Sequence, residues 1–355
     1  MNSRLLIASL ILIGLTMCRK EQAVQQTDRV ASPPIRSVDI SSFPKIREAG
    51  TDFYDADGKQ TDMLLILKDA GVNTIRLRLW VNPDSMYSSF QEVAKFSDEL
   101  QQVGFDIWLS LHYSDTWADP GQQSKPQKWN GLSFDDLLDT VYHYTYKVAY
   151  HIQPAIIQIG NEINSGFLHP EGNRTNKQQF HLLLQQGIRA VRSASPGSLI
   201  MMHYAGHVNS EYFLEELDTL DFDLLGLSYY PIWHGQVLDS LRNKLRLLAT
   251  LGDRRILIAE TAYPFTLGYN DHTNNIVGLP SQLIPGYAAS PQGQKKYIAK
   301  IRQICSDLKA VDGFCYWGAE LLSWKGPQST EGSPWENQAL FDFDERALPA
   351  LDVFD

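Results

Sequence analysis

Cysteine is scarce in this sequence, which has three cysteines among 355 residues: Cys18, Cys305 and Cys315. So few cysteines exclude a disulfide-dense scaffold, and no Cys-x-x-Cys or Cys/His spacing typical of a zinc site is present. Cys305 lies in a helical pattern and Cys315 in an apolar, strand-like run. This placement favours two buried free thiols over a disulfide between them.

Positive charge is in deficit, and phosphate-binding motifs are missing. Lys and Arg total 31 against 41 Asp and Glu, so the formal net charge is −10, and no basic run interrupts this balance. An acidic chain of this kind argues against binding nucleic acid. No glycine-rich fingerprint follows the first predicted strand, which argues against a nucleotide cofactor. We expect no required cofactor, and the default expectation for assembly is a monomer.

The only long apolar run near the amino terminus, residues 5–15, is too short to span a bilayer. With Arg4 before it, this run predicts a signal peptide over residues 1–18. The segment Leu15-Thr16-Met17-Cys18 is similar to a bacterial lipoprotein signal, in which the cysteine is lipidated and becomes the mature amino terminus. Met17 replaces the small residue that is usual before the cysteine, which leaves ordinary signal cleavage open.

The segment after Cys18, residues 19–36, is polar and rich in glutamine, which predicts a flexible tether. Residues 37–355 are expected to form the domain that carries the function. These boundaries predict an exported lipoprotein at the outer membrane or the cell surface, which contacts the membrane through its lipid alone.

Within the domain, apolar strand-like runs alternate with amphipathic helical stretches. The strands are expected at Val38–Ser41, Asn73–Trp80, Phe105–His112, Ile156–Glu162, Leu199–Tyr204, Leu224–Tyr230, Ile256–Thr261 and Gly313–Gly318, and helices between them at Thr61–Ala70, Phe90–Val103, Phe134–Tyr150, Lys177–Ser193, Val237–Leu251 and Pro291–Leu308. Alternation of this kind implies a parallel sheet with right-handed crossovers. Eight such units in about 310 residues fit a single (β/α)8 barrel of the α/β class better than an open sheet.

Two glutamates end apolar runs that a structural barrel would leave without charge. Glu162 ends the fourth strand and Glu260 the seventh, so they are expected to face each other across the mouth of the barrel, where (β/α)8 enzymes carry their chemistry. Two carboxyl groups suffice for cleavage of a glycosidic bond, one as acid and one as nucleophile or base. Aromatic residues reach 11%, and several lie beside this pair, as in a cleft that stacks sugar rings.

The two carboxyl groups need opposite protonation states. Glu260, as nucleophile, must be ionised, and Arg78 or Arg76 on the same strand face is expected to lower its pKa. Tyr229 or Tyr230 is expected to donate a hydrogen bond to it. Glu162, as general acid and then base, must be protonated when substrate arrives, so burial and the neighbouring charge are expected to raise its pKa. Asn161 is placed to bind the sugar 2-hydroxyl.

Seven ordered segments resemble glycoside hydrolase family 53, the endo-β-1,4-galactanases, and they run from the first strand to the carboxyl terminus. They are Phe53-Tyr-Asp-Ala-Asp-Gly58, Ile75-Arg-Leu-Arg-Leu-Trp80, His112-Tyr-Ser-Asp-Thr-Trp-Ala-Asp-Pro-Gly121, Gly160-Asn-Glu-Ile-Asn164, Leu227-Ser-Tyr-Tyr-Pro231, Glu260-Thr-Ala-Tyr-Pro264 and Trp335-Glu-Asn-Gln-Ala-Leu-Phe341. The resemblance implies a clan A barrel that hydrolyses β-1,4-galactan or type I arabinogalactan within the chain, with retention of configuration. It also implies the roles of Glu162 and Glu260 given above.

Further site residues follow from the resemblance. It implies active-site positions for His112, Asn161 and Tyr229, and it implies substrate contacts in the aromatic and acidic positions of the same motifs. The residues expected to bind or support the substrate are Arg78, His112, Asp115, Trp117, Asp119, Asn161, Tyr229, Tyr230, Trp317, Trp324 and Trp335.

Some bacterial members of that family carry a calcium-binding loop after strand seven. The corresponding loop here offers Asn270, Asp271, His272 and Asn274, whose spacing differs and which include one carboxylate. Because calcium prefers several oxygen ligands including carboxylates, we do not expect calcium here, and we expect no metal elsewhere.

Three rival interpretations share parts of this pattern. A metal-dependent hydrolase would use His112, His203, His207 and His234, whose spacing does not match a metal motif. A non-catalytic glycan-binding lipoprotein would keep the aromatic cleft but would not need both glutamates. A retaining β-glycanase acting on another polysaccharide would share the catalytic residues, so the family-specific motifs alone argue against it.

Overall fold

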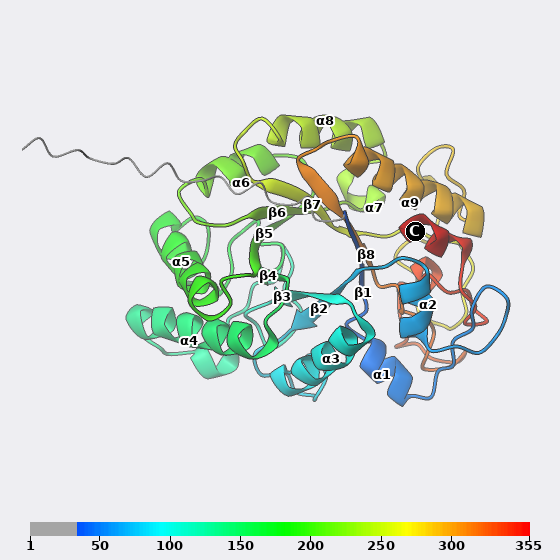
Figure 1. Cartoon of the computed structure of the whole chain (residues 1–355), viewed down its shortest axis with the longest axis horizontal. Helices are drawn as coiled ribbons and strands as arrows, with labels where there is room; N and C mark the ends of the chain where they lie inside the picture. Colours follow the sequence, from blue (N-terminus) through cyan, green and yellow to red (C-terminus); the bar gives the residue numbers. More distant parts are fainter. Residues whose placement is uncertain (1–33) are drawn as a thin grey trace, which may run out of the picture. The chain divides into compact units, whose positions relative to one another are not determined.

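A computed structural model describes residues 34–355, which form one compact unit. The predicted signal peptide, Cys18 and almost all of the predicted tether lie outside these residues. Eight parallel strands close into a barrel in sequence order, with β8 paired to β1 (Figure 1). The strands are β1 (Ile35–Asp39), β2 (Thr74–Leu79), β3 (Asp106–Leu111), β4 (Ile156–Ile159), β5 (Leu199–Ala205), β6 (Leu224–Ser228), β7 (Arg255–Thr261) and β8 (Val311–Trp317). The predicted single (β/α)8 barrel is confirmed.

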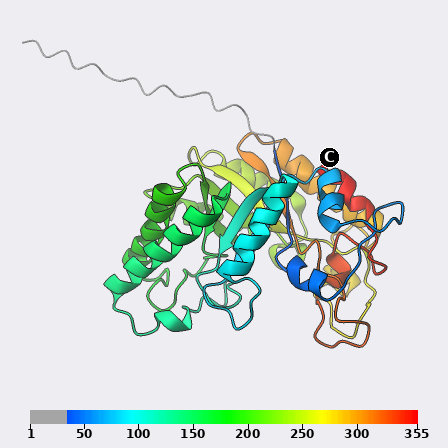
Figure 2. The same ribbon diagram turned by 60° about the horizontal axis from the view of Figure 1, so that its bottom comes forward.

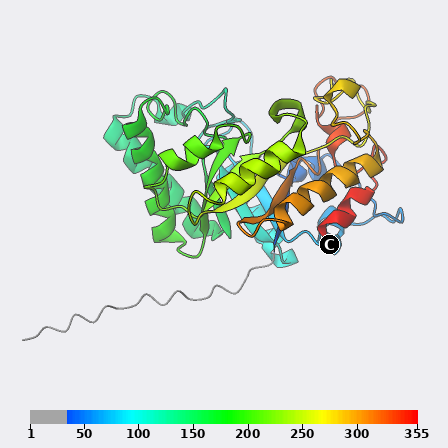
Figure 3. The same cartoon turned by 90° about the horizontal axis from the view of Figure 1, so that it is seen from above.

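Helices surround the strands (Figure 1). They are α1 (Phe43–Glu48), α2 (Met63–Asp69), α3 (Phe90–Val103), α4 (Phe134–Ile152), α5 (Lys177–Ala194), α6 (Ser210–Glu216), α7 (Pro231–His234), α8 (Leu238–Leu248) and α9 (Pro291–Ser306), with short 3-10 turns η1 (Gln127–Trp129), η2 (Pro280–Gln282), η3 (Glu336–Gln338) and η4 (Pro349–Phe354). Helices α4 and α5 lie side by side (Figure 2), and the carboxyl-terminal η4 packs on α9 (Figure 3). None of the helices in the described part is long and apolar enough to cross a membrane.

Local sequence explains where the long helices begin and end. Helix α3 starts where the Ser89 side chain accepts a hydrogen bond from the amide of Glu92, and it ends at Gly104, whose left-handed φ of 93° suits glycine. Its buried positions, such as Val93, Phe96 and Leu100, recur at helical spacing and face the barrel. The sequence predicts both ends of this helix correctly.

Several predicted boundaries are wrong, for physical reasons. The short helices α1, α6 and α7 were not expected, because fewer than about two turns give no readable periodicity. Strands β3 and β4 end before the polar residues that the sequence assigned to them, since the backbone turns into left-handed conformations at Tyr113 and Glu162. Strand β6 ends at Ser228, two residues before the predicted end. At the other end, β1 starts at Ile35, so the last two residues of the predicted tether belong to the barrel.

The inside of the barrel is divided into two layers. An apolar floor near the amino-terminal ends of the strands consists of Trp108, Ile156, Met201, Leu224, Leu257, Ala259 and Cys315. Above the floor lies a polar layer that is open to solvent. Its lowest member is Arg76, whose guanidinium carbon lies 5.5 Å from the Trp108 ring centroid. Cys305 and Cys315 are buried free thiols, as predicted. Strand β1 therefore starts at the apolar end of the barrel, and the polar side chains lie at the carboxyl-terminal ends of the strands.

Candidate active site

A cleft of about 810 Å³ opens at the carboxyl-terminal ends of the strands. Most of the predicted site residues line it: Arg78, His112, Trp117, Asp119, Asn161, Glu162, Tyr230, Glu260, Trp317, Trp324 and Trp335. Asp115 and Tyr229 do not. The cleft therefore gathers residues from β2, β7 and β8 and from the loops after β3, β4 and β6, as a barrel active site does.

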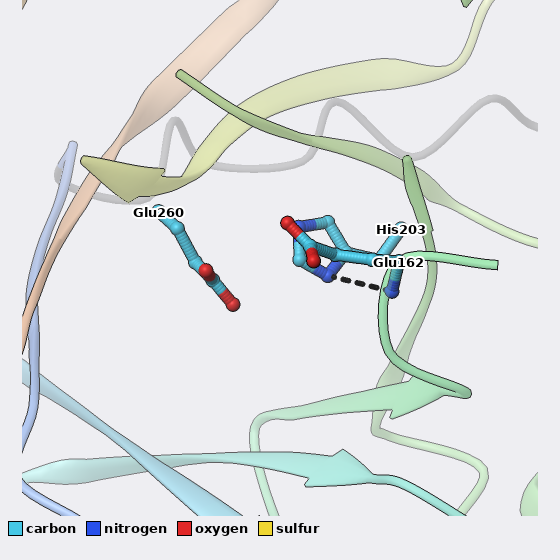
Figure 4. A group of neighbouring side chains, drawn as sticks. All are labelled: Glu162, His203 and Glu260. Carbon is cyan, nitrogen blue, oxygen red and sulfur yellow. Dashed lines mark hydrogen bonds between the residues drawn. The ribbon is translucent and has the colours of Figure 1, made fainter. Parts of the chain in front are cut away.

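Glu162 and Glu260 project into the same space from opposite sides of the barrel (Figure 4). Three atoms lie within 4.8 Å of one another: a carboxylate oxygen of Glu162, a carboxylate oxygen of Glu260 and a ring nitrogen of His203. Carboxyl groups in retaining glycosidases are about 5–5.5 Å apart, whereas inverting enzymes need about 6.5–9.5 Å to admit a water molecule. The separation fits direct attack by one carboxylate on the sugar.

Two donors hold the carboxyl group of Glu260. Arg76 Nη2 lies 2.8 Å from Oε1, and the Tyr230 hydroxyl donates to Oε2 at 2.9 Å. Arg76 is itself held by Asp39, whose Oδ2 is 2.8 Å from Nη1. These charge-assisted bonds stabilise an ionised Glu260 and fix its direction. Of the alternatives that the sequence left open, Arg76 and Tyr230 are the partners of Glu260.

Arg78 has a different role from the one expected. Its guanidinium carbon lies 4.6 Å from the Trp80 ring and 4.0 Å from the Trp117 ring, and its Nε and Nη2 donate to Ser88. Burial lowers the pKa of Arg78 to about 10, with nearby carboxylates opposing this effect. Arg78 thus supports the aromatic wall of the cleft and does not contact Glu260.

Glu162 receives a single side-chain hydrogen bond, from the Ser228 hydroxyl to Oε1 at 2.6 Å. Burial, and then the charge of Glu260, raise the pKa of Glu162. The residue has a left-handed φ of 48°, and Gly160 before it has a φ of 78°. A Cβ at Gly160 would lie 2.5 Å from Ile163 Cγ2, so the turn that aims Glu162 requires glycine there.

The pKa of Glu260 differs from the sequence prediction. Burial raises it, and Arg76 and Tyr230 offset this only in part, so the arginine does not bring it below its usual range. The two carboxyl groups are close enough to share one proton. Arg76 and Tyr230 favour the charge on Glu260, whereas Glu162 has a neutral donor, and the proton therefore resides on Glu162.

Two neighbours of the pair have defined hydrogen-bonding directions. Asn161 Oδ1 accepts from Arg76 at 2.8 Å, and its Nδ2 donates to the Ala118 carbonyl at 2.8 Å while lining the cleft. His112 Nδ1 accepts from the Ala118 amide at 3.1 Å. Burial and then Arg78 and Arg76 lower the pKa of His112 well below its usual value. A neutral His112 with its proton on Nε2 can donate to a sugar hydroxyl.

Asp115 and Tyr229, which were expected to bind or support the substrate, are not among the residues that line the cleft. Both carboxylate oxygens of Asp115 accept backbone amides, those of Asn82 and Gln127, so this residue shapes the loop after β3. The Tyr229 hydroxyl donates to the Gly235 carbonyl, away from the cleft. Adjacent residues leave a strand on opposite faces, and here Tyr230 is the one that faces inward.

An aromatic row crosses the cleft. Trp80 and Trp117 have ring centroids 5.6 Å apart, Trp117 and Trp317 6.2 Å, and Trp317 and Trp335 4.5 Å. Trp233 continues the row 5.9 Å from Trp335 and is 54% exposed. The sequence did not single out Trp80 or Trp233. Neighbouring rings are tilted by 56° to 78°, so the row offers several separate faces on which sugar units of one polymer can stack.

The four calcium candidates lie on the loop after β7. His272 and Asn274 are exposed, the Asn270 amide donates to Ser323, and Asp271 Oδ1 accepts from the amide of Thr273. Calcium prefers several converging oxygens including carboxylates, and that this loop binds none stays a prediction.

Four histidines were candidate ligands of the metal-dependent rival. Among the described residues, the acidic and histidine atoms that come close enough for a shared ion are those of Glu162, His203 and Glu260. Both ring nitrogens of His203 are engaged in hydrogen bonds, and Glu260 is paired with Arg76. These contacts account for the three side chains, and that the site needs no metal stays a prediction.

Comparison with known proteins gives consistent matches over the barrel. The family model described as Glycosyl hydrolase family 53 matches residues 35–354. An arabinogalactan endo-beta-1,4-galactanase of Cellvibrio japonicus is 30% identical over 376 residues, which cover 100% of this chain and 97% of that protein. The solved Ignisphaera aggregans GH53 catalytic domain is 39% identical with a TM-score of 0.85, covering 92% of this chain and 98% of that one. A structure of fungal beta-1,4-galactanases is 28% identical with a TM-score of 0.79, covering 91% and 99%.

Proposed function

Because this chain belongs to glycosyl hydrolase family 53, we propose that it hydrolyses β-1,4-galactan, or type I arabinogalactan, within the polymer and with retention of configuration. The observation that carries the proposal is the close pair Glu162 and Glu260, whose different partners give them different protonation states. The aromatic row supports a polymeric substrate.

The first step forms a covalent intermediate. A Glu260 oxygen attacks C1 of a galactose unit while the bond from C1 to the leaving oxygen breaks. The proton of Glu162 moves to that oxygen and completes the hydroxyl of the released chain. Asn161 Nδ2 and His112 Nε2 are the groups of this cleft placed to donate to the sugar hydroxyls.

The second step returns the enzyme to its starting state. Glu260 loses its charge when it is glycosylated, so the repulsion that raised the pKa of Glu162 disappears. Glu162 then takes a proton from water, the hydroxide oxygen bonds to C1, and the bond from C1 to Glu260 breaks. No metal ion enters either step, and we propose that activity requires none.

A panel of polymers tests the proposed substrate. We expect galacto-oligosaccharides of several lengths from β-1,4-galactan, with the β-anomer formed first, and little release from mannan, xylan or mixed-linkage β-glucan. Product sizing measures the lengths of the oligosaccharides, and NMR of newly formed products identifies the first anomer. Incubation with EDTA should leave the rate unchanged.

Release from another polymer and none from galactan would indicate a β-glycanase of the same clan instead. A loss of all activity with EDTA would revive the metal-dependent alternative.

We also propose that the enzyme is an exported lipoprotein anchored through Cys18 and active as a monomer. The sequence similar to a lipoprotein signal supports the anchor, and a monomer is the default expectation. Cells expressing the full chain with labelled palmitate should yield a labelled, membrane-bound protein, and Cys18→Ser should be unlabelled. Labelling of the Cys18→Ser protein would contradict the assignment, and a soluble, unlabelled natural chain would indicate ordinary signal cleavage.

A further inference from the structure

His203 and Ser228 lie directly behind Glu162, and the mechanism above does not use them. Both are fully buried, His203 on β5 and Ser228 at the end of β6. From the sequence, His203 is a candidate ligand of the metal-dependent rival, with a hydrogen-bonded or surface histidine as the favoured interpretation. Figure 4 shows its ring hydrogen-bonded to the backbone nitrogen of Glu162.

The hydrogen bonds of His203 determine which ring nitrogen carries its proton. The backbone amide of Glu162, which can only donate, points to Nδ1 at 3.3 Å. Asn161 Oδ1, 3.1 Å from the same nitrogen, already accepts from Arg76 and Gln158. Burial and then the charge of Arg76 lower the pKa of His203 well below its usual value, so the ring is neutral. Its one proton is therefore on Nε2.

This tautomer directs the hydroxyl of Ser228. His203 Nε2 lies 2.9 Å from Ser228 Oγ and donates to it. The single hydroxyl hydrogen of Ser228 is then free for Glu162 Oε1, 2.6 Å away. The chain runs in one direction, from the Glu162 amide through His203 and Ser228 to the Glu162 carboxyl group.

We propose that His203 and Ser228 are positioning residues that hold the Glu162 carboxyl group by Oε1, so that the catalytic proton is carried by Oε2. The inference rests on the proposed role of Glu162 as acid and base. Accepting the hydrogen bond from Ser228 makes Oε1 the less basic oxygen, so the proton resides on Oε2, which is left to face the leaving group. The same bond holds the carboxylate in place while Oε2 accepts a proton from water in the second step.

The charged and titratable groups around Glu162 set the pH range in which this arrangement works. Glu260 and Asp119 raise the pKa of Glu162, whereas Arg76 and the Ser228 hydrogen bond lower it. Removal of the Ser228 hydroxyl is therefore expected to raise that pKa further. Because Glu162 must be protonated to act as acid, the alkaline limb of the kcat/KM profile should move to higher pH.

Ser228→Ala tests the proposal with two substrates that differ only in the leaving group, 2,4-dinitrophenyl and phenyl β-1,4-galactobioside. A phenyl leaving group needs the proton, so its kcat/KM should fall about 10- to 100-fold through misplacement of the acid. Dinitrophenolate leaves without a proton, so its kcat/KM should change by less than about threefold. The alkaline limb should move up by up to about one pH unit.

Two histidine variants of similar size provide the matched control. In His203→Gln, the amide can accept from the Glu162 backbone and donate to Ser228, so the alkaline limb and the leaving-group dependence should stay close to those of the natural enzyme. In His203→Leu, both should change as in Ser228→Ala. Circular dichroism melts identify any variant that is not folded.

The outcomes separate this inference from the proposed function. An equal loss on both substrates, with an unmoved alkaline limb, would show that Ser228 only supports the fold, and would overturn the inference. If the natural enzyme itself showed no leaving-group dependence and no alkaline limb, Glu162 would not be its acid. That result would refute the proposed mechanism, and the inference with it.

Discussion

Glu260→Ala is expected to lower kcat on galactan by at least about 10⁴-fold, because the carboxylate that forms the bond to C1 is lost. The variant should still fold, although Arg76 loses one of its two carboxylate partners and keeps Asp39. With 2,4-dinitrophenyl β-1,4-galactobioside, added azide should occupy the vacated space and restore turnover. The product should be the α-galactosyl azide, inverted relative to the substrate, as NMR can establish.

Glu331→Gln is the matched control for this prediction. Glu331 also lines the cleft but is exposed and outside the carboxyl pair. Its amide variant should retain activity within about fivefold, since an exposed carboxylate contributes little. Near-normal activity of Glu260→Ala on galactan would refute the nucleophile assignment.

Glu162→Ala should show the complementary behaviour. Its kcat/KM on galactan is expected to fall on the order of 10³-fold, because the leaving oxygen departs without a proton. Azide should attack the glycosyl-enzyme on the face where water normally enters, giving the β-galactosyl azide with retained configuration. Inverted azide from Glu162→Ala, or retained azide from Glu260→Ala, would mean that the two roles are exchanged.

The pH profile gives a second measurement of the same residue. Burial and the Glu260 charge raise the pKa of Glu162 to about 8, so the natural enzyme should keep its acid up to about that pH. Activity on galactan should decline as the pH rises through this value, because Glu162 then loses its proton. Glu162→Ala should lack this alkaline limb, whatever its residual rate.

The sequence predicts the barrel and the closeness of Glu162 and Glu260 well, because both depend on patterns that local chemistry determines. Strand and helix periods alternate along the whole domain, and Glu162 and Glu260 each end an apolar run. Helix α3 is predicted to the residue, since a capping serine and a terminal glycine mark its ends. Periodicity and capping residues can be read directly from the amino-acid sequence.

The partners of the pair could be predicted only in part. Arg76 and Arg78 have the same parity on β2, and parity gives the face of a strand but not the depth at which a side chain lies. Arg76 lies over Trp108 at the floor and reaches both Asp39 and Glu260, whereas Arg78 lies one layer higher, between Trp80 and Trp117. Depth in a barrel depends on strand stagger, which the sequence does not display.

The connection between His203 and Ser228 was not predictable for a similar reason. The two residues come from neighbouring strands, and their pairing depends on the register of β5 against β6 and on the left-handed turn that carries Glu162. A histidine inside an apolar strand was the available signal. It indicated a buried polar role, but the direction of its hydrogen bonds required the coordinates.

The entry of the chain at the floor of the barrel has a consequence for work at a surface. Strand β1 starts at Ile35 on the face opposite the cleft, and Glu162, Glu260 and the aromatic row lie at the other end. If the chain is anchored at Cys18 as proposed, the point of attachment and the cleft lie at opposite ends of the barrel. Attachment at that end leaves the mouth of the cleft unobstructed, so that a long polymer can bind across it and be cleaved at an internal bond.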